Sequence, residues 1–528
     1  MIMKECNQLE ELVNKVSDEI NGILRTNLYE VGLSERDIDN LKAKKGDLRE
    51  ALRNSGIGDI YAKKYVKQTI RNILTSKLIN NSEDYNLYIP FDFPNKLSVR
   101  EKFDILLYFF ALSDNEMALG RMLDEYIYDS GRTAYKEPCV TREQIEALYD
   151  RMDIFLSKSD KLEILVQRIY SQYKGLGVID DIRDMKIEGV SAGVSGKYGD
   201  NSTVWIIYKG ISIHLSFLEF ESELELERVC MNIYRYDSPG QLSKSKGYIV
   251  NEMKDNSRVV VVRPPFAENF AFFVRKFDTI ENKKLDQLLT DDGWDMMEEV
   301  LKLIIKGCQV SAITGAQGSG KTTLLMSLIG FIPSNFSLRI QEQAFELHLR
   351  QIYPMRNILT FRETEYVSGQ EGLDIQKKTD GVVNILGEVA SNDVAAWMIQ
   401  MSQVASLFTL FTHHAKTTDN LIKYMRNALI INGNFSNERI ALEQVVDAIR
   451  LDIHMAKDRK GHRYIDRISE IVIGMGKELY EVRDVVRFDG DKYVVANGFS
   501  NEIAKDMEKY LSDEEVELLY AKYCIQNK

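Results

Sequence analysis

The stretch Gly315-Ala316-Gln317-Gly318-Ser319-Gly320-Lys321-Thr322 fits the phosphate-binding pattern G-x-x-x-x-G-K-[ST] at every fixed position. The apolar residues 310–314 before it predict a strand, and residues 322–331 after it predict a helix. A strand, a glycine-rich loop and a helix in this order place backbone N–H groups and a helix N-terminus around phosphate oxygens. Lys321 can reach the outer phosphates and the Thr322 hydroxyl can bind Mg²⁺, so we expect a nucleotide site rather than a chance glycine-rich turn.

The composition indicates a globular chain of several domains. The 528 residues, 44% hydrophobic and 28% charged, exceed the size of one core, so two to four domains are expected. The longest apolar run, residues 105–112, is far shorter than the roughly 20 residues that span a bilayer, and no secretory signal is visible. The five cysteines are scattered without metal or disulfide spacing, which favours a reducing cytoplasm.

The net charge of −12 bears on possible partners. It argues against a broad electrostatic attraction to nucleic acid, although a local basic groove could be hidden in the total. We therefore expect no direct nucleic-acid partner, and we interpret the acidity as a contribution to solubility.

Hydrophobic periodicity divides the chain into four regions: 1–170, 171–280, 281–500 and 501–528. The first is expected to be mostly helical, with helices in 60–79 and 100–112 and a third that an N-cap at Thr141 opens and that runs through residue 155. The second is expected to be a small α+β domain, with strands at 202–208, 210–217, 257–263 and 270–277.

The third region alternates short apolar strands with helices. Its predicted strands are 310–314, 338–341, 382–386 and 406–412, followed by hairpin-like segments at 451–456, 463–465, 468–473, 480–488 and 492–496. Such alternation predicts an α/β fold with a parallel sheet covered on both faces. The acidic tail, 501–528, is expected to be helical.

Candidate chemical groups follow the predicted strands. Glu342 comes directly after 338–341, and Glu388 follows 382–386 across one glycine. Ligand chemistry gathers at the carboxyl ends of parallel strands, so either carboxylate could polarise a water molecule; a solvated glutamate at a helix start is an equally weighted alternative. His413-His414 ends the strand 406–412, and adjacent strand residues point to opposite faces, so at most one faces the nucleotide.

The order of these motifs resembles the ATPases of type II and type IV secretion and type IV pilus assembly. The branch that the sequence resembles most serves tight-adherence (Flp) pilus assembly and is related to conjugative secretion ATPases. Residues 315–323 look like the Walker A loop of this family, 339–347 like its Asp box, 384–389 like its Walker B motif, and 412–415 like its His box. Residues 255–259 and 273–277 look like its two arginine-bearing stretches, so the resemblance covers about residues 170–500.

The resemblance implies a C-terminal RecA-like P-loop domain that hydrolyses ATP with Mg²⁺. Residues Gly315 through Thr323 would bind the nucleotide, with Thr322 and Glu388 at the metal. Glu388 and Glu342 would be the catalytic carboxylates, and His414 would contact the γ-phosphate. Arg258 and Arg275 would supply positive charge from the preceding domain.

The family also implies an assembly and a place of action. Its members form homohexameric rings at the cytoplasmic face of the inner membrane, work with an inner-membrane platform protein, and drive pilin or secreted substrates. For this chain the resemblance therefore implies a cytoplasmic ring, peripheral at the cell membrane.

Several positions depart from the family pattern. Gln343 replaces the Asp-box aspartate, Ala390 stands where Walker B carries arginine, and Lys423 stands at a later arginine position. These changes make slow turnover plausible and keep open a nucleotide-gated structural ring with little hydrolysis. A nucleic-acid translocase on a similar fold is a third reading, against which the acidity argues.

Overall fold

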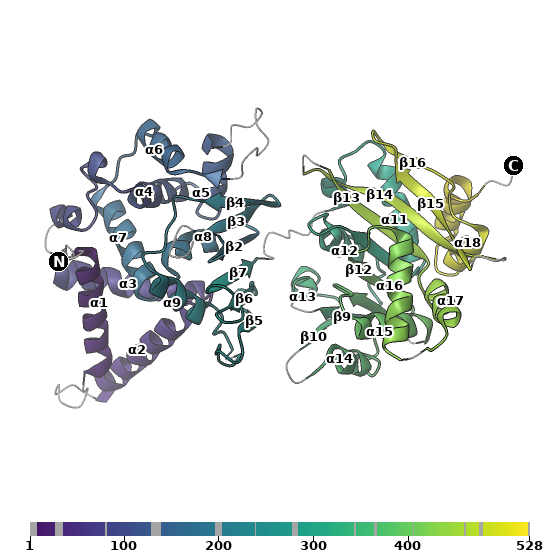
Figure 1. The fold of residues 1–528 in the computed structure, drawn as a ribbon, viewed down its shortest axis with the longest axis horizontal. Helices are drawn as coiled ribbons and strands as arrows, with labels where there is room; N and C mark the ends of the chain where they lie inside the picture. The colour runs from purple at the N-terminus through teal and green to yellow at the C-terminus, as the bar shows by residue number, and fades with distance from the viewer. Residues whose placement is uncertain are drawn as a thin grey trace. The chain divides into compact units, whose positions relative to one another are not determined.

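The computed structural model describes residues 8–26, 35–79, 82–127, 139–195, 203–237, 239–276, 284–342, 345–363, 367–404, 406–433, 435–458, 461–474 and 479–525. Among the sequence predictions, Gln343, the start of the strand predicted at 202 and the end of the strand predicted at 277 lie outside these ranges. The chain forms two compact units, Met1–Thr279 and Ile280–Lys528, shown in Figure 1. Each unit is described by itself.

The first unit opens with helices that bury apolar stripes. They are α1 (Gln8–Arg25), α2 (Glu35–Asn54), α3 (Ile60–Ile73), α4 (Val99–Ala111), α5 (Ala118–Arg121), α6 (Arg142–Arg151), α7 (Lys158–Tyr173), α8 (Asp180–Asp184) and α9 (Glu223–Ile233). The helix predicted at 60–79 is confirmed as α3 followed by a π-helical turn at Leu74–Leu78. The cap predicted at Thr141 is confirmed, since Thr141 and Gln144 form a reciprocal capping box.

The predicted end of that helix at residue 155 is wrong. Helix α6 ends at Arg151, and Met152 is already extended, with φ −88° and ψ 130°. Met152, Ile154 and Leu156 alternate with exposed neighbours and pack against the apolar cores. Burial of every second side chain requires an extended segment, so tertiary packing ends the helix early.

The sheet of the first unit has seven strands in the order β1-β4-β3-β2-β7-β6-β5. They are β1 (Cys139–Val140), β2 (Gly189–Ala192), β3 (Trp205–Tyr208), β4 (Ile211–Leu215), β5 (Tyr248–Glu252), β6 (Arg258–Val262) and β7 (Ala271–Arg275). The four predicted strands are β3, β4, β6 and β7. Strands β1, β2 and β5 were not predicted, because they have only two, four and five residues and too little alternation of apolar and polar side chains.

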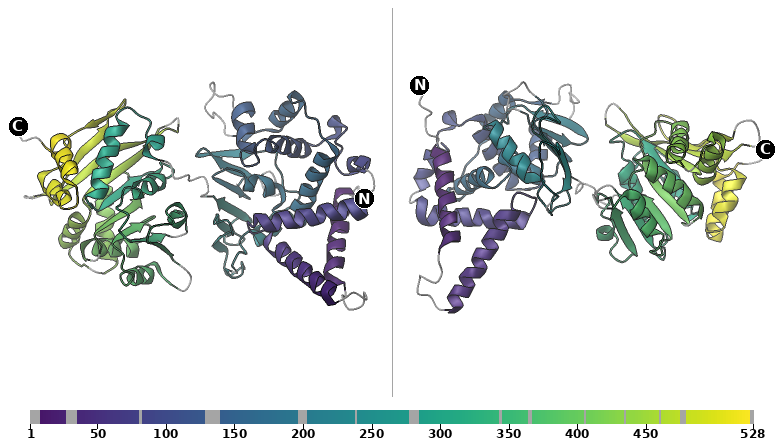
Figure 2. Two further views of the ribbon diagram at one scale, coloured as in Figure 1. Left: turned by 180° about the vertical axis from the view of Figure 1, so that it is seen from behind. Right: turned by 60° about the horizontal axis from the view of Figure 1, so that its bottom comes forward.

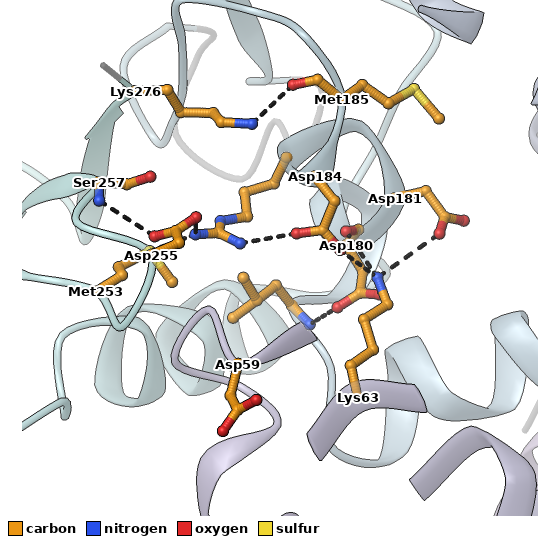
Figure 3. Close-up of polar contacts among 12 residues, drawn as sticks. Asp59, Lys63, Asp180, Asp181, Asp184, Met185, Met253, Asp255, Ser257 and Lys276 are labelled. Atoms are coloured by element: carbon orange, nitrogen blue, oxygen red, sulfur yellow. Dashed lines mark hydrogen bonds and ion pairs between the residues drawn. The ribbon is translucent and has the colours of Figure 1, made fainter. Parts of the chain in front are cut away.

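Buried ion pairs join the helices of this unit to its sheet (Figure 3). The Lys63 ammonium of α3 lies 2.6 Å from Asp180 Oδ2 and 2.7 Å from Asp184 Oδ2, both on α8. Arg183 of α8 is buried and pairs with Asp184 and with Asp255, which lies between β5 and β6. Breaking such a pair strands a buried charge, so these contacts hold α3, α8 and the sheet in one unit. A domain boundary near residue 170 therefore stays a prediction.

The second unit is an α/β domain around a nine-stranded sheet, ordered β10-β9-β11-β12-β8-β13-β14-β15-β16. The strands are β8 (Ser311–Gly315), β9 (Leu338–Glu342), β10 (Ile358–Arg362), β11 (Val383–Leu386), β12 (Phe408–His413), β13 (Leu451–Lys457), β14 (Arg463–Ile473), β15 (Tyr480–Phe488) and β16 (Tyr493–Val495). Along this sheet order, the neighbouring strands from β10 to β13 pair in parallel. The neighbouring strands from β13 to β16 pair antiparallel.

Helices cover both faces of this sheet, as Figure 2 shows from two further directions. They are α10 (Leu285–Leu288), α11 (Trp294–Lys306), α12 (Lys321–Ile329), α13 (Leu349–Ile352), α14 (Gly369–Gln376), α15 (Asn392–Val404), α16 (Thr418–Ile431), α17 (Glu438–Ala448), α18 (Asn501–Glu508) and α19 (Asp513–Leu518). Ile313 and Leu410 pack with α11 and α12, whereas Ala312 and Phe411 pack with α15 to α17. The neighbouring side chains of one strand thus enter two cores, as a buried parallel sheet requires.

The predicted fold class is confirmed in its α/β character: an α/β domain with a parallel-rich sheet and the phosphate loop follows a unit that combines helices with an antiparallel-rich sheet. Two of the strand predictions for the second unit are wrong. The segments predicted at 463–465 and 468–473 form the single strand β14, and the edge strand β10 was not predicted. Among the described residues, no helix is long and apolar enough to span a membrane.

Candidate active site

Three glycines shape the loop between β8 and α12. Gly315, Gly318 and Gly320 have φ values of 139°, 74° and 98°, which other residues rarely adopt. A Cβ at Gly315 would also lie 2.2 Å from the Met455 carbonyl oxygen of β13. The glycine pattern of the motif is therefore needed both for the turn and for close packing against β13.

Lys321 begins α12, and its ammonium group has three acceptors. Its Nζ lies 2.9 Å from the carbonyl oxygens of Gly315 and Ala316, and 3.2 Å from Nδ1 of His414. Burial lowers the pKa of Lys321 to about 8, and Glu388 opposes this shift. The side chain is 6% exposed, so a cation is held in the loop where a phosphate would approach the helix N-terminus.

His414 connects Lys321 to Glu388. Its Nε2 lies 3.1 Å from Glu388 Oε1, while its Nδ1 faces the lysine ammonium. An ammonium can only donate, so Nδ1 accepts and Nε2–H donates to the carboxylate. Lys321 follows β8, His414 follows β12 and Glu388 follows β11, so three neighbouring strand ends supply one hydrogen-bonded line.

The other histidine of the pair points away from this line. His413 is 8% exposed, and its Nδ1 lies 2.9 Å from the Val389 carbonyl oxygen. Burial lowers the pKa of His413. The structure thus places one of the two histidines next to the phosphate loop, as strand alternation predicts.

Glu342 ends β9 and is bound by its own loop. Its Oε1 accepts from the backbone N–H groups of Glu346 and Leu347, each at 2.9 Å, and its side chain is buried. A Cβ at Gly387 would lie 3.1 Å from Glu342 Cγ. The glycine before Glu388 therefore leaves room for Glu342, and the two carboxylates belong to adjacent strand ends. A catalytic role for Glu342 stays a prediction.

A buried carboxylate behind the loop was not predicted. Asp452 of β13 is fully buried; its Oδ1 accepts from the Thr314 hydroxyl at 2.5 Å and its Oδ2 from the Thr418 hydroxyl at 2.6 Å. Thr314 Oγ1 also lies 2.8 Å from His454 Nδ1. Burial raises the pKa of Asp452 and lowers that of His454. One polar group thus ties the strand before the loop to helix α16, and its only sequence signal is an aspartate within an apolar run.

Arg463 was also missed. This residue begins β14, and its Nε donates to the Gly318 carbonyl oxygen at 2.9 Å. The contact adds a second cation to the loop, from a residue 145 positions further along the chain. No sequence pattern links Arg463 to the loop, because only the β13–β14 pairing brings it there.

The two predicted arginines lie in the first unit. Arg258 of β6 and Arg275 of β7 occupy directly paired positions, and both alternate with buried valines. They therefore share the face of the sheet opposite to the core. Arg275 is about half exposed and lies 3.9 Å from Glu188. Their role at a nucleotide stays a prediction.

Two features of the loop itself are compatible with a bound Mg²⁺–nucleotide. The Ser319 side chain is fully buried, and its Oγ has no hydrogen-bond partner within the described part of the chain. A Cβ at Gly318 would meet nothing within 4 Å, so the loop is open there. Among the described residues no cluster of three or more His, Cys, Asp or Glu could hold a metal. Mg²⁺ typically takes one or two protein oxygens and completes its shell with phosphates and water, which suits Thr322 and Glu388.

Comparison with known proteins gives structural similarities only. No protein-family model and no curated protein matches the chain. The VirB11 ATPase of the Brucella suis type IV secretion system, in complex with sulphate, is 16% identical, and the match covers 54% of this chain and 89% of that chain with a TM-score of 0.30. The Legionella pneumophila ATPase DotB is 16% identical over 65% and 85%, with a TM-score of 0.40. The pilus retraction motor PilT with bound ADP is 14% identical over 66% and 90%, with a TM-score of 0.39.

Proposed function

We propose that this chain binds ATP with Mg²⁺ and hydrolyses it as a homohexameric motor. The observation that carries the proposal is the line Lys321–His414–Glu388 at the phosphate loop, with contacts of 3.2 and 3.1 Å. Lys321 binds the outer phosphates, and Glu388 accepts the proton of the attacking water. Mg²⁺, held by Thr322 and Glu388, would neutralise phosphate charge when bound.

The motor would power pilus assembly or protein secretion at the cytoplasmic face of the inner membrane. This part of the proposal rests on the order of the four motifs between residues 315 and 415 and on the two arginine-bearing stretches before them. An inner-membrane platform protein is the partner that this assignment requires. Copurification of the full chain with a polytopic membrane protein would support it.

Phosphate release tests the chemistry. Replacing Glu388 by glutamine keeps the size of the side chain and removes the proton acceptor, so turnover should fall roughly 100-fold or more while ATP binding persists. The matched control is Glu481→Gln, which changes an exposed glutamate on β15. Both variants and the wild type are assayed as purified oligomers with saturating ATP and Mg²⁺.

Two other outcomes would change the proposal. Equally slow release by the wild type and Glu388→Gln would favour a nucleotide-gated structural ring, for which the exposed Ala390 at an arginine position is the specific observation. Turnover that DNA stimulates, and that salt weakens, would favour a nucleic-acid translocase. We expect neither, because Lys321, Thr322 and both glutamates are retained.

A further inference from the structure

A cavity of about 210 Å³ lies within the first unit, whereas the phosphate loop belongs to the second unit. Its walls come from α3, α4, α7 and α8. The volume is below the roughly 300–1,000 Å³ of sites for drug-sized molecules, so only a small ligand would fit. Neither the motifs nor the proposed motor function uses this cavity.

One wall is apolar and the others are charged. Leu107, Ala111, Leu112, Ile164 and Met185 provide the apolar surface. Three cations and three acids also line the cavity: Lys67, Arg100, Arg168, Asp104, Glu163 and Asp181. A site with an apolar surface and a few convergent polar groups is the usual composition of a ligand pocket.

One of the three acids, Glu163, has a close partner that does not line the cavity, whereas the cation nearest to Asp181 outside the lining, Lys63, is closer to Asp180 and Asp184. Glu163 Oε1 lies 2.7 Å from Arg71 Nη1, and Asp181 Oδ1 lies 3.8 Å from Lys63 Nζ. Figure 3 shows Asp181 directed toward Lys63, beside the ion pairs that hold α8. Burial raises the pKa of Asp181 to about 6, which further reduces its negative charge in weakly acidic solution.

Two of the cations, Arg100 and Arg168, share a single acid. Arg100 Nε lies 2.8 Å from Asp104 Oδ1, and Arg168 lies 2.9 Å through Nε and 2.5 Å through Nη2 from Asp104 Oδ2. Within the described residues, no carboxylate lies within ion-pair distance of the Lys67 ammonium, which is only partly exposed. Three lining cations against the two carboxylates of Asp104 and Asp181 leave one positive charge in excess at the cavity.

We propose that this cavity binds a small organic acid, whose anionic group pairs with Lys67 and the Arg100–Arg168 fork and whose apolar body packs against Leu107, Ala111 and Ile164. The geometry suits an acid because guanidinium groups offer several N–H donors and a buried cation gains from an anion. Burial lowers the pKa of Lys67, so the unliganded chain holds this charge at a cost.

The test uses the full chain and salicylate, a small aromatic acid, in a ligand-observed NMR titration. Lys67→Gln should weaken salicylate binding about tenfold, because it removes a charge-assisted hydrogen bond to the anion. The matched control Lys64→Gln removes an exposed lysine from the same helix and should bind like the wild type. Ala111→Phe fills the cavity and should abolish binding, with folding checked by circular dichroism.

The proposal is overturned by no binding to the wild type, by equal affinity in Lys67→Gln and Lys64→Gln, or by benzyl alcohol binding as tightly as salicylate. If Ala111→Phe fails to fold, the comparison of Lys67→Gln with Lys64→Gln still tests the proposal. Because the readout is binding in the first unit, failure here is distinguishable from failure of the proposed ATPase, which the phosphate-release assay reports.

Discussion

At the scale of single residues, Lys321 has the most constrained environment of the candidate site. Its ammonium donates to two loop carbonyls and to His414, which uses all three N–H groups. A phosphate can bind only if the lysine exchanges at least one of these acceptors for a phosphate oxygen. Nucleotide binding would then change the acceptors of Lys321, while His414 would keep its contact with Glu388.

The pH dependence of ATP affinity tests this environment. The pKa of Lys321 is about 8 in the free protein, and a bound polyanion raises it, so binding takes up a proton above pH 8. ATP affinity should be nearly constant below pH 8 and fall by up to about tenfold per pH unit above it. Lys321→Arg keeps its charge in this range and should give a flat profile; a flat wild-type profile would contradict the assignment.

At the scale of elements, Asp452 connects β8, β13 and α16 through the hydroxyls of Thr314 and Thr418. These elements hold the two ends of the site, because β8 enters the phosphate loop and α16 follows the segment with His414. A carboxylate that satisfies two buried hydroxyls fixes their separation better than packing alone.

Asp452→Ala should lower the stability of this region by about 3 kcal/mol, because two buried hydroxyls lose their acceptor. Asp452→Asn should cost less, since it keeps an acceptor and removes the buried charge responsible for the raised pKa. Asp447→Ala, at an exposed position of α17, is the control and should change stability by less than about 0.5 kcal/mol. Hydrogen exchange of the β8 and β13 amides measures the stability of all three variants. If Asp452→Ala lost no more stability than the Asp447→Ala control, the structural role of Asp452 would be refuted.

Sequence reasoning located the elements with strong local signals. Four of the strands that pair in parallel, β8, β9, β11 and β12, were found within two residues of their ends, because each is a short, largely apolar run. Lys321, His414 and Glu388 were each predicted from a motif that follows a strand, and the structure joins them in one line of contacts. Asp452 and Arg463 were missed because their partners, Thr314 and Gly318, lie more than 130 residues away, and only strand pairing brings them together.

At the scale of the whole molecule, the chain has two compact units, and the candidate catalytic groups divide between them. Lys321, Glu388 and His414 belong to the second unit, whereas Arg258 and Arg275 are paired on one face of the first. A motor that couples hydrolysis to movement needs positive charge that reaches the phosphate in one nucleotide state only. Supplying this charge is the role proposed for Arg258 and Arg275.

Arg275→Ala should therefore lower ATP turnover by roughly tenfold or more and leave ATP affinity within about twofold, because the guanidinium would act mainly in the transition state. Arg235→Ala, an exposed arginine of the same unit, is the control and should leave both unchanged. Equal losses in turnover and affinity for Arg275→Ala would place the arginine in ground-state binding instead.

The most direct test of the central claim is a structure of the full chain with Mg²⁺ and a non-hydrolysable ATP analogue. The account predicts that the Lys321 ammonium moves from the loop carbonyls to the outer phosphates, with Glu388 and His414 beside the terminal phosphate. A loop that binds no nucleotide at saturating analogue, or Glu388 directed away from the terminal phosphate, would contradict it.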